Sequence, residues 1–325
     1  MMRSLLVIIC AGLIITPDFK TDAVRSHARE APSREFSMRP SASDFQTASE
    51  PREVGSGGRE KAEERPSGFW IFDRPSQLGG MISDRGGFSD GYSVVPRGYS
   101  HLEFGYSFFH DKENKSRTKS HLLGEFSYRT GLWENFELRI KWSGYSFTES
   151  HFEGTSRWAG RNVMLTDHED GGTDMSLGFK TQLVKQKHLI PNLSIIPAIS
   201  LPTGTGSKST GDVDPEMRLA WNYSLSEKWS VYGVGLATWL SDDEGRFFQS
   251  GASLATSYQF TPRLGGYLEY YGLYPNSRDS DAQHNIDFGP LILVNDNFQI
   301  DIRVGFGLNE EAPDFQAGIG FSYRF

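Results

Sequence analysis

Charged residues recur at alternate positions in several stretches of the sequence, and this spacing decides what chemistry they could do. Bulky apolar residues stand between them, so an extended strand would carry all the charges on one face. Because acids and bases nearly balance, they favour a cross-linked network of ion pairs, with a charge-selective filter as the alternative. The candidates are Glu103, Glu125, Glu137, Asp174, Glu216, Glu269, Asp287 and Asp301, with Arg129, Arg139, Lys141, Lys180, Arg218, Arg303 and Arg324.

Ester hydrolysis is a second possible chemistry, because it needs a serine and a histidine within hydrogen-bond reach. His151 and Ser156 are close in sequence, but they lie in a long predicted loop without a partner motif. The stretch GTGSKST at 204–210 lacks the Gly-Lys-Ser/Thr end of a phosphate-binding loop. Acids such as Asp212 and Asp214 lack a full calcium-ligand spacing. The sequence therefore predicts no catalytic residue, no metal site, no cofactor and no enzyme activity.

Period-two patterning runs through most of the chain after residue 98. In the segment 136–142, for example, Phe136, Leu138 and Ile140 alternate with charged residues. Two segments contain Pro197 and Pro290, where we expect bulges because proline removes a ladder donor. The predicted strands are 99–109, 121–130, 136–142, 174–183, 193–201, 216–223, 229–240, 247–260, 264–274, 285–294, 298–309 and 315–325.

These strands suit a membrane barrel better than a soluble fold. A membrane-spanning strand needs about 9–11 residues, whereas soluble strands average about 5–6. One face of each strand is apolar with aromatic ends, and the other is polar, as in outer-membrane barrels. Connections alternate between short turns and longer loops, the longest being 148–172. We therefore predict an all-β fold: an antiparallel transmembrane β-barrel of about 12 strands. A soluble sandwich or lipocalin-like barrel is the alternative.

The first part of the chain predicts export. Arg3 precedes a short apolar run from Leu5 to Ile15, which is typical of a signal peptide, and small residues at Ala23 and Ala28 offer alternative cleavage points. We assign residues 1–28 to this signal peptide and 29–67 to a disordered linker rich in charged and small residues. Cys10 is the only cysteine of the sequence, and lipidation at this position is an alternative.

Residues 68–97 lie between the linker and the predicted barrel at 98–325. This segment is apolar and aromatic in its first part and rich in glycine in the second. We expect a periplasmic pre-barrel segment that either enters the barrel mouth as a partial plug or packs on its rim. Inward-facing glycines such as Gly105 and Gly320 are expected to leave room for a passage.

The stretch ISDRGGFSDGYSVVPRGYSHLEFGYSF (82–108) resembles the opening of a family of outer-membrane transporters associated with the meta-pathway of phenol degradation. The resemblance extends to the end of the sequence through GLWENFELRI, SLPTG and LEYYG. It departs from the family pattern at Gly86, where proline is usual. The resemblance implies an outer-membrane barrel for small solutes and supplies no catalytic residues. The matching motif residues are Asp84, Arg85, Gly87, Phe88, Pro96 and Gly98.

The sequence ends on alternating aromatic residues, Phe321, Tyr323 and Phe325. This ending resembles the signal that the barrel-insertion machinery of bacterial outer membranes reads. The net charge of −8 gives no reason to expect a nucleic-acid partner. We therefore expect a protein of a Gram-negative-type outer membrane, in contact with its lipids, that passes small solutes, including aromatic or hydrophobic compounds, by passive diffusion. The alternatives are a structural or adhesion barrel with a sealed lumen and an outer-membrane esterase or phospholipase.

Overall fold

The computed structural model describes residues 80–325, except 82, 114–115, 157–160, 243–244 and 277–280. The predicted signal peptide (1–28) and linker (29–67) lie outside the described residues. Within the described ranges, no helix is long and apolar enough to span a membrane. The described part of the chain is built from antiparallel strands and their connections, as the alternating sequence predicts.

The strands follow one another round a single sheet, mostly in chain order. They are β1 (Ser100–Glu113), β2 (Ser116–Trp133), β3 (Phe136–Trp142), β4 (Tyr145–Ser156), β5 (Arg161–Gly172), β6 (Met175–Val184), β7 (Asn192–Leu201), β8 (Asp214–Ser224), β9 (Trp229–Asp242), β10 (Gly245–Thr261), β11 (Leu264–Pro275), β12 (Gln283–Asn295), β13 (Phe298–Gly307) and β14 (Phe315–Arg324).

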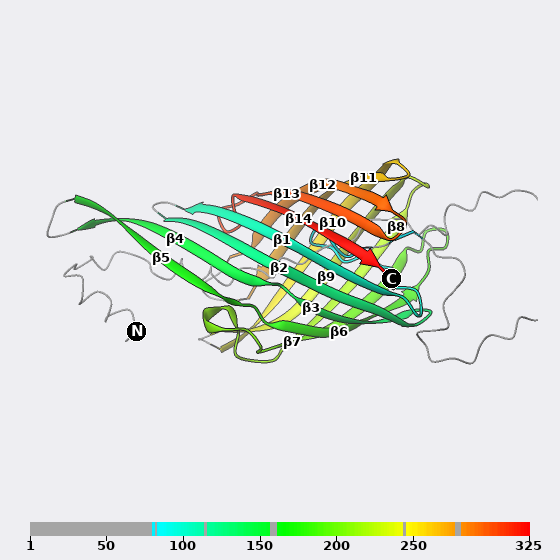
Figure 1. Cartoon of the computed structure of the whole chain (residues 1–325), viewed down its shortest axis with the longest axis horizontal. Helices are drawn as coiled ribbons and strands as arrows, with labels where there is room; N and C mark the ends of the chain where they lie inside the picture. Colours follow the sequence, from blue (N-terminus) through cyan, green and yellow to red (C-terminus); the bar gives the residue numbers. More distant parts are fainter. Residues whose placement is uncertain (1–79, 82, 114–115, 157–160, 243–244, 277–280) are drawn as a thin grey trace, which may run out of the picture.

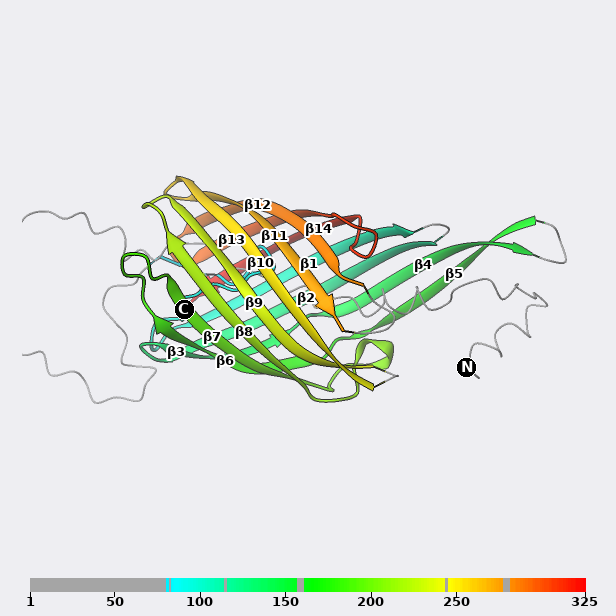
Figure 2. The ribbon, with the colours of Figure 1, turned by 180° about the vertical axis from the view of Figure 1, so that it is seen from behind.

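Twelve of the fourteen strands in the described residues form a closed ring, tilted as Figures 1 and 2 show. The ring closes because β1 pairs with β14 on one side and with β2 on the other. At the base of the β1–β14 seam, Ser100 and Phe325 exchange backbone hydrogen bonds of 2.9 and 3.0 Å. Closure leaves no open edge, which a bilayer would not tolerate. The prediction of an antiparallel barrel of about 12 strands is therefore confirmed.

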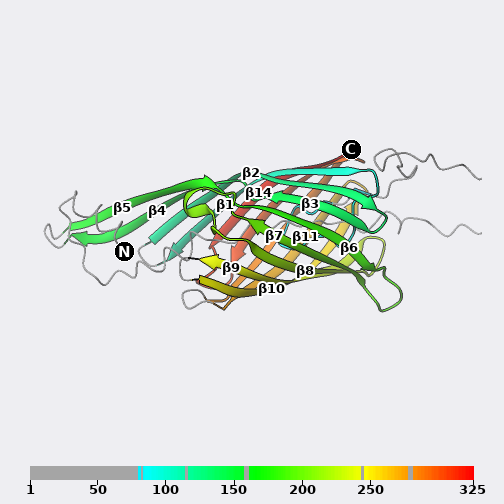
Figure 3. The same cartoon turned by 90° about the horizontal axis from the view of Figure 1, so that it is seen from below.

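The remaining strands, β4 and β5, form a hairpin that continues beyond the ring (Figures 1 and 3). β2 is long enough to pair with β3 through Tyr128 and with β4 through Lys119. Between β3 and β4 the chain bends at Gly144, whose φ of +96° favours glycine. The prediction of a loop over 148–172 was wrong, because the outer half of β2 offers this segment a pairing edge.

The two faces of the ring differ as the alternation requires. Outward side chains such as Ile302, Phe306 and Phe321 are apolar and exposed, whereas inward neighbours such as Gln299 and Ser322 are polar and fully buried. An apolar outer belt on a closed antiparallel barrel matches the lipid-facing surface of outer-membrane proteins. The protein is therefore a barrel of a Gram-negative-type outer membrane, and the polar interior is where its function must be sought.

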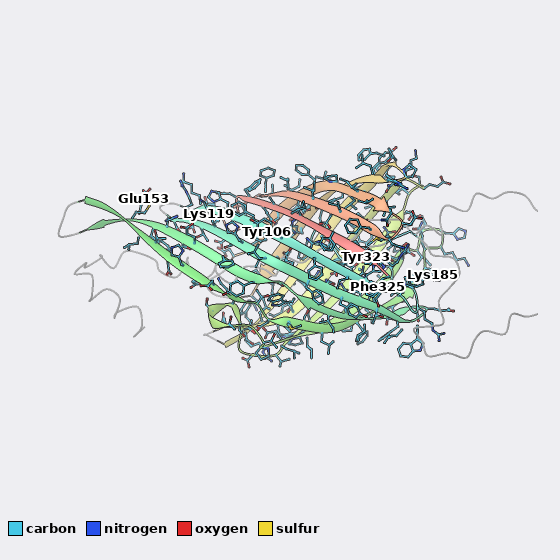
Figure 4. All side chains as sticks on the ribbon, in the orientation of Figure 1. Tyr106, Lys119, Glu153, Lys185, Tyr323 and Phe325 are labelled. Atoms are coloured by element: carbon cyan, nitrogen blue, oxygen red, sulfur yellow. The ribbon has the colours of Figure 1, made fainter. Side chains whose placement is uncertain are left out.

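The two ends of the barrel can be assigned from its connections. Short turns lie at the end where β14 finishes, which is the periplasmic end in outer-membrane barrels. Figure 4 shows Phe325, Tyr323 and Lys185 toward this end, and Glu153 near the tip of the β4–β5 hairpin at the other.

Pro197 and Pro290 both lie inside strands, as the sequence analysis expected. Pairing between β12 and β13 stops at Phe288 and resumes at Leu291, so the ladder is interrupted beside Pro290. β7 is interrupted in the same way beside Pro197 on its β6 side. In both strands the other neighbour keeps its register through the proline, and the ring stays closed.

Candidate functional site

Residues 83–95, which we call the lumen segment, cross the interior of the barrel before β1 begins. The Ser83 hydroxyl lies 2.5 Å from that of Ser322 on β14, and the Tyr92 carbonyl accepts a hydrogen bond from Ser194 on β7. β14 and β7 lie on opposite sides of the ring in strand order. The lumen segment therefore spans the interior from wall to wall.

Local turns, rather than regular secondary structure, shape the lumen segment. Gly86 has a φ of +123° and Gly98, just before β1, has a φ of +77°, values that side chains other than hydrogen disfavour. The Asp84 carboxylate accepts a hydrogen bond of 3.1 Å from the Gly91 backbone N–H, closing a loop. This loop presents its acidic side chains to one side of the barrel.

A basic arc of the wall receives the two acids of the lumen segment. Asp84 lies 2.6 Å from Arg139, 3.0 Å from Lys180 and 3.3 Å from Arg129. The arc occupies one continuous part of the ring, from β8 through β7, β6 and β3 to β2. It consists of Arg129 (β2), Arg139 and Lys141 (β3), Lys180 (β6) and Arg218 (β8), with Glu137 and Glu216 among them.

Asp90 binds to the same arc, nearer to β8. Its Oδ1 atom lies 2.6 Å from Arg139 Nη2 and 3.0 Å from Lys141 Nζ, and its Oδ2 atom lies 2.7 Å from Arg218 Nη1. Both oxygens therefore accept charge-assisted hydrogen bonds, which are shorter and stronger than neutral ones. Arg139 contacts both acids of the lumen segment and so links them.

The pKa values of the two acids reflect this surrounding charge. Burial by itself raises the pKa of Asp84, but Arg129, Lys180 and Arg139 lower it well below its ordinary value of 3.8. Burial likewise raises the pKa of Asp90, and Lys141, Arg139 and Arg218 together bring it well below the same value. Both groups are therefore carboxylates at neutral pH.

An acidic arc, which runs from β11 round to β2 and adjoins the basic arc there, receives the cation of the lumen segment. Arg85 lies 3.2 Å from Asp301 and 3.5 Å from Glu125. A Cβ atom built on Gly105 or Gly320 would overlap the Arg85 guanidinium. The expectation that these glycines leave room for a passage was wrong, because Arg85 fills that room. The arc consists of Glu103 (β1), Glu125 (β2), Glu269 (β11), Asp287 (β12) and Asp301 (β13), and Arg303 lies among them.

Carboxylates of the wall also bind the backbone of the lumen segment. Glu269 accepts hydrogen bonds from the backbone N–H groups of Phe88, at 2.6 Å, and Ser89, at 3.0 Å, and from the Ser89 hydroxyl. Glu137 accepts one of 2.6 Å from the Val95 N–H. These bonds satisfy donors that would otherwise be buried without partners. They fix the segment's path as well as its side chains.

Phe88 is the aromatic contact between the lumen segment and the wall. Its ring stacks on Tyr271 of β11, with centroids 4.6 Å apart and planes 4° from parallel, and the Arg218 guanidinium lies 5.2 Å from the ring centroid. Leu236 and Leu273 complete a buried apolar cluster around it. Phe88 thus occupies a slot formed by an aromatic plane, a cation and aliphatic side chains.

The inward-facing residues predicted from the sequence have different surroundings. Lys141 is partly exposed, and Glu216 pairs at 3.0 Å with Arg218 on its own strand. Arg324 donates instead to the Asn297 side chain and the Asp296 carbonyl in the β12–β13 turn. The fully or nearly fully buried ones are Glu103, Glu125, Arg129, Glu137, Arg139, Lys180, Arg218, Glu269, Asp287, Asp301, Arg303 and Arg324.

Asp174 was placed wrongly by the sequence analysis. It lies in the connection between β5 and β6, where its carboxylate accepts hydrogen bonds of 2.8 Å from the Gly204 N–H and 2.9 Å from the Thr210 N–H. The strand begins one residue later, at Met175, so Asp174 does not share the inner face. It orders an outer loop instead of lining the lumen.

Several contributors were not predicted. Asp90 reads as an ordinary loop acid, and Tyr271 as one aromatic residue among many, because nothing local indicates that they meet the basic arc and Phe88. The residues of the family motif have structural roles that their spacing in the sequence does not show. A Cβ atom on Gly87 would overlap the Glu269 carboxylate, and the carbonyl of Pro96 lies close against Gly131 of β2. In the described ranges, no group of three or more His, Cys, Asp or Glu side chains could hold a metal ion.

Similarity to known proteins agrees with this architecture. An outer membrane channel from Pseudomonas putida F1 is 17% identical, with a TM-score of 0.52 over 72% of this chain and 98% of that one. The NanC porin is 10% identical (TM-score 0.40; 69% and 98% covered), and the transport unit of the Escherichia coli autotransporter AIDA-I is 12% identical (TM-score 0.42; 70% and 90% covered). No curated protein sequence matches. A family model described as "Putative MetA-pathway of phenol degradation" matches residues 83–325, from the first residue of the lumen segment through all the strands of the barrel, and the chain belongs to that family.

Proposed function

We propose that the protein is an outer-membrane channel through which small solutes diffuse passively, and that residues 68–97 act as its plug. The observation that carries the proposal is the polarity of the wall behind the lumen segment. A sealed structural barrel fills its interior with wall side chains, as narrow eight-stranded barrels do. Here a separate segment fills the interior, and the wall behind it is charged.

The contacts of the lumen segment suit reversible occupation. Ion pairs and hydrogen bonds hold Asp84, Arg85 and Asp90, and water can replace such bonds when the segment leaves. The exposed wall would then be wettable, and twelve strands lie between filled eight-stranded barrels and open sixteen-stranded porins in diameter. The family match begins at Ser83, so the lumen segment is part of the shared unit.

Liposome swelling with full-length protein and with a variant lacking residues 80–95 tests the proposal. We expect slow swelling with small solutes for the full chain and faster swelling for the deletion, because its lumen has lost the occluding segment. Heat-modifiable gel mobility verifies that both barrels are folded. If folded deletion protein admits no solute at all, the lumen is sealed by other means and the channel proposal fails.

The alternative is a structural or adhesion barrel whose work is done by the β4–β5 hairpin. The projection of this hairpin beyond the ring favours it (Figure 3). The swelling of the full-length protein separates the two functions, because an adhesion barrel with its segment in place gives no solute-dependent swelling.

Assembly is proposed to involve the barrel-insertion machinery, acting on the aromatic residues of β14. Phe321, Tyr323 and Phe325 are all exposed on the outer face. A Phe325→Ala variant is expected to reach the outer membrane in lower yield, measured by fractionation. Undiminished yield would argue against this role.

A further inference from the structure

The side chains of Phe88 and Asp90 together present a benzene ring and a carboxylate to one patch of the wall. They are two residues apart, and the same guanidinium, that of Arg218, lies 5.2 Å from the Phe88 centroid and 2.7 Å from the Asp90 carboxylate. One guanidinium therefore contacts both groups, so the ring and the carboxylate are held on the same cation of the wall.

The ring half of this patch is a preformed slot. Tyr271 offers a parallel aromatic face at 4.6 Å, Arg218 offers a cation to the ring, and Leu236 and Leu273 bound it laterally. Stacked rings and cation–π contacts each stabilise an aromatic guest beyond simple burial. The slot belongs to the barrel wall and would persist if Phe88 left it.

The part of the patch that binds the Asp90 carboxylate is positively charged, even when the nearby acidic residues of the wall are counted. Asp90 is bound by Arg139, Lys141 and Arg218 at 2.6–3.0 Å. The acids that face these cations are Glu137, 3.7 Å from Arg139, Glu216, 3.0 Å from Arg218, and Asp84 of the lumen segment itself. When the segment withdraws, Asp84 and Asp90 leave together, and the patch is left with an excess of positive charge.

We infer that this patch, formed by Arg139, Lys141, Arg218 and Tyr271, is a binding site for small aromatic carboxylates, and that Phe88 and Asp90 of the lumen segment occupy it in their place. The inference deepens the proposed function, on which it rests, by naming the solute class. An aromatic acid entering the barrel competes with the segment for the same contacts. Lys141, which is partly exposed, is the first of these cations that it meets.

Benzoate binding to purified full-length protein, measured by isothermal titration calorimetry, tests the inference. The Phe88→Ala/Asp90→Ala double variant vacates the patch and is expected to bind benzoate at least about tenfold more tightly than the wild type, because the segment no longer competes. Arg218→Gln is expected to bind at least about tenfold more weakly, since it loses a charge-assisted hydrogen bond and the cation over the ring. Tyr271→Leu weakens benzoate binding and spares acetate.

Matched controls define the chemistry. Tyr270→Leu alters the neighbouring outward-facing residue of β11 and should leave benzoate binding unchanged. Benzyl alcohol, which has the ring without the charge, and benzylamine, which reverses the charge, should bind far more weakly than benzoate. Equal binding of benzoate and benzyl alcohol, or full benzoate binding by Arg218→Gln, overturns the inference. If the double variant does not fold, the comparison of wild type with Arg218→Gln decides alone.

Binding and passage are measured separately, so the two proposals can fail separately. Benzoate binding without swelling of liposomes by any solute would remove the channel and keep the site. Swelling by many solutes, with no benzoate saturation and no effect of Arg218→Gln, would keep the channel and remove the site.

Discussion

Replacing Asp84 with asparagine should release the lumen segment from the wall. The substitution preserves the shape of the side chain and removes the charge that faces Arg139, Lys180 and Arg129 at 2.6–3.3 Å. Asp84 and its partners Arg129 and Lys180 are fully buried, so water cannot compensate for the lost charge. We expect the lumen segment to move and the wall to stay in place, because hydrogen-bond ladders hold the strands of the wall together.

The size of the effect follows from this geometry. Removing one partner of an isolated buried ion pair costs about 3–5 kcal/mol. Arg129 and Lys180 keep Glu137 as a partner, so the lower figure is the one to use here. At about 1.4 kcal/mol per tenfold change, the lower figure shifts the ratio of docked to released segment about a hundredfold toward release. The amide of asparagine restores only part of the lost interaction. Its oxygen can still accept from Arg139 and Arg129, but its NH₂ group then faces Lys180 and the Gly91 N–H, which are both donors.

Single-channel recording in planar bilayers measures this shift as open probability. We expect Asp84→Asn to open far more often than wild type at the same voltage, with the open-state conductance unchanged. Asp212→Asn, at an exposed position of an outer loop, is the matched control and should behave as wild type. An Asp84→Asn channel with wild-type open probability would refute the reasoning that ion pairs hold the segment in place.

Three further outcomes follow from the same contacts. The pKa of Asp84 is lower when the lumen segment is bound to the wall than when it is released. The ion pairs of Asp84 therefore stabilise the bound segment fully above the ordinary pKa of 3.8, and this stabilisation weakens only as pH falls below that value. The contribution of Asp84 to the open probability should therefore not change between pH 7 and pH 5. Gly320→Val should raise open probability by expelling the Arg85 guanidinium, whereas Gly235→Val, where a Cβ atom meets nothing within 4 Å, should not. Replacing residues 149–168 by an Asn-Gly turn should leave heat-modifiable folding and conductance intact, because that hairpin lies outside the ring; loss of the folded form would show that β4 and β5 support the barrel.

The ring was predictable because every residue of its strands faces either lipid or the polar interior. Lipid outside and polar groups inside impose period two over the whole span, as at Phe298, Ile300 and Ile302. The β4–β5 hairpin escaped prediction because it lies beyond the membrane, where no such contrast is imposed. Asp174 failed for a related reason: it lies one residue before β6 begins, in an outer connection where no such contrast is imposed.

The lumen segment could not be placed from sequence, because its position depends on partners distant in the chain. Phe88 and Ser89 are fixed by Glu269, and Ser83 by Ser322, so none of these contacts leaves a local pattern. The family motif identified this stretch as part of the family, but its glycines and charged residues do not indicate which strands of the barrel they contact. Complementarity between segment and arcs emerges only when the ring is closed.

The seam between β1 and β14 has a consequence for the order in which the molecule is assembled. β1 follows directly on the lumen segment, and β14 is the final strand, so the closing pair joins the two extremes of the barrel sequence. Contacts between such distant residues form late, since the intervening chain must first be organised. Before the seam forms, the charged inner face of the incomplete sheet is open on one side. The lumen segment can bind to this face, and the remaining strands can then pair around it. Its burial would then be a step of biogenesis, completed before the mature barrel has an inside.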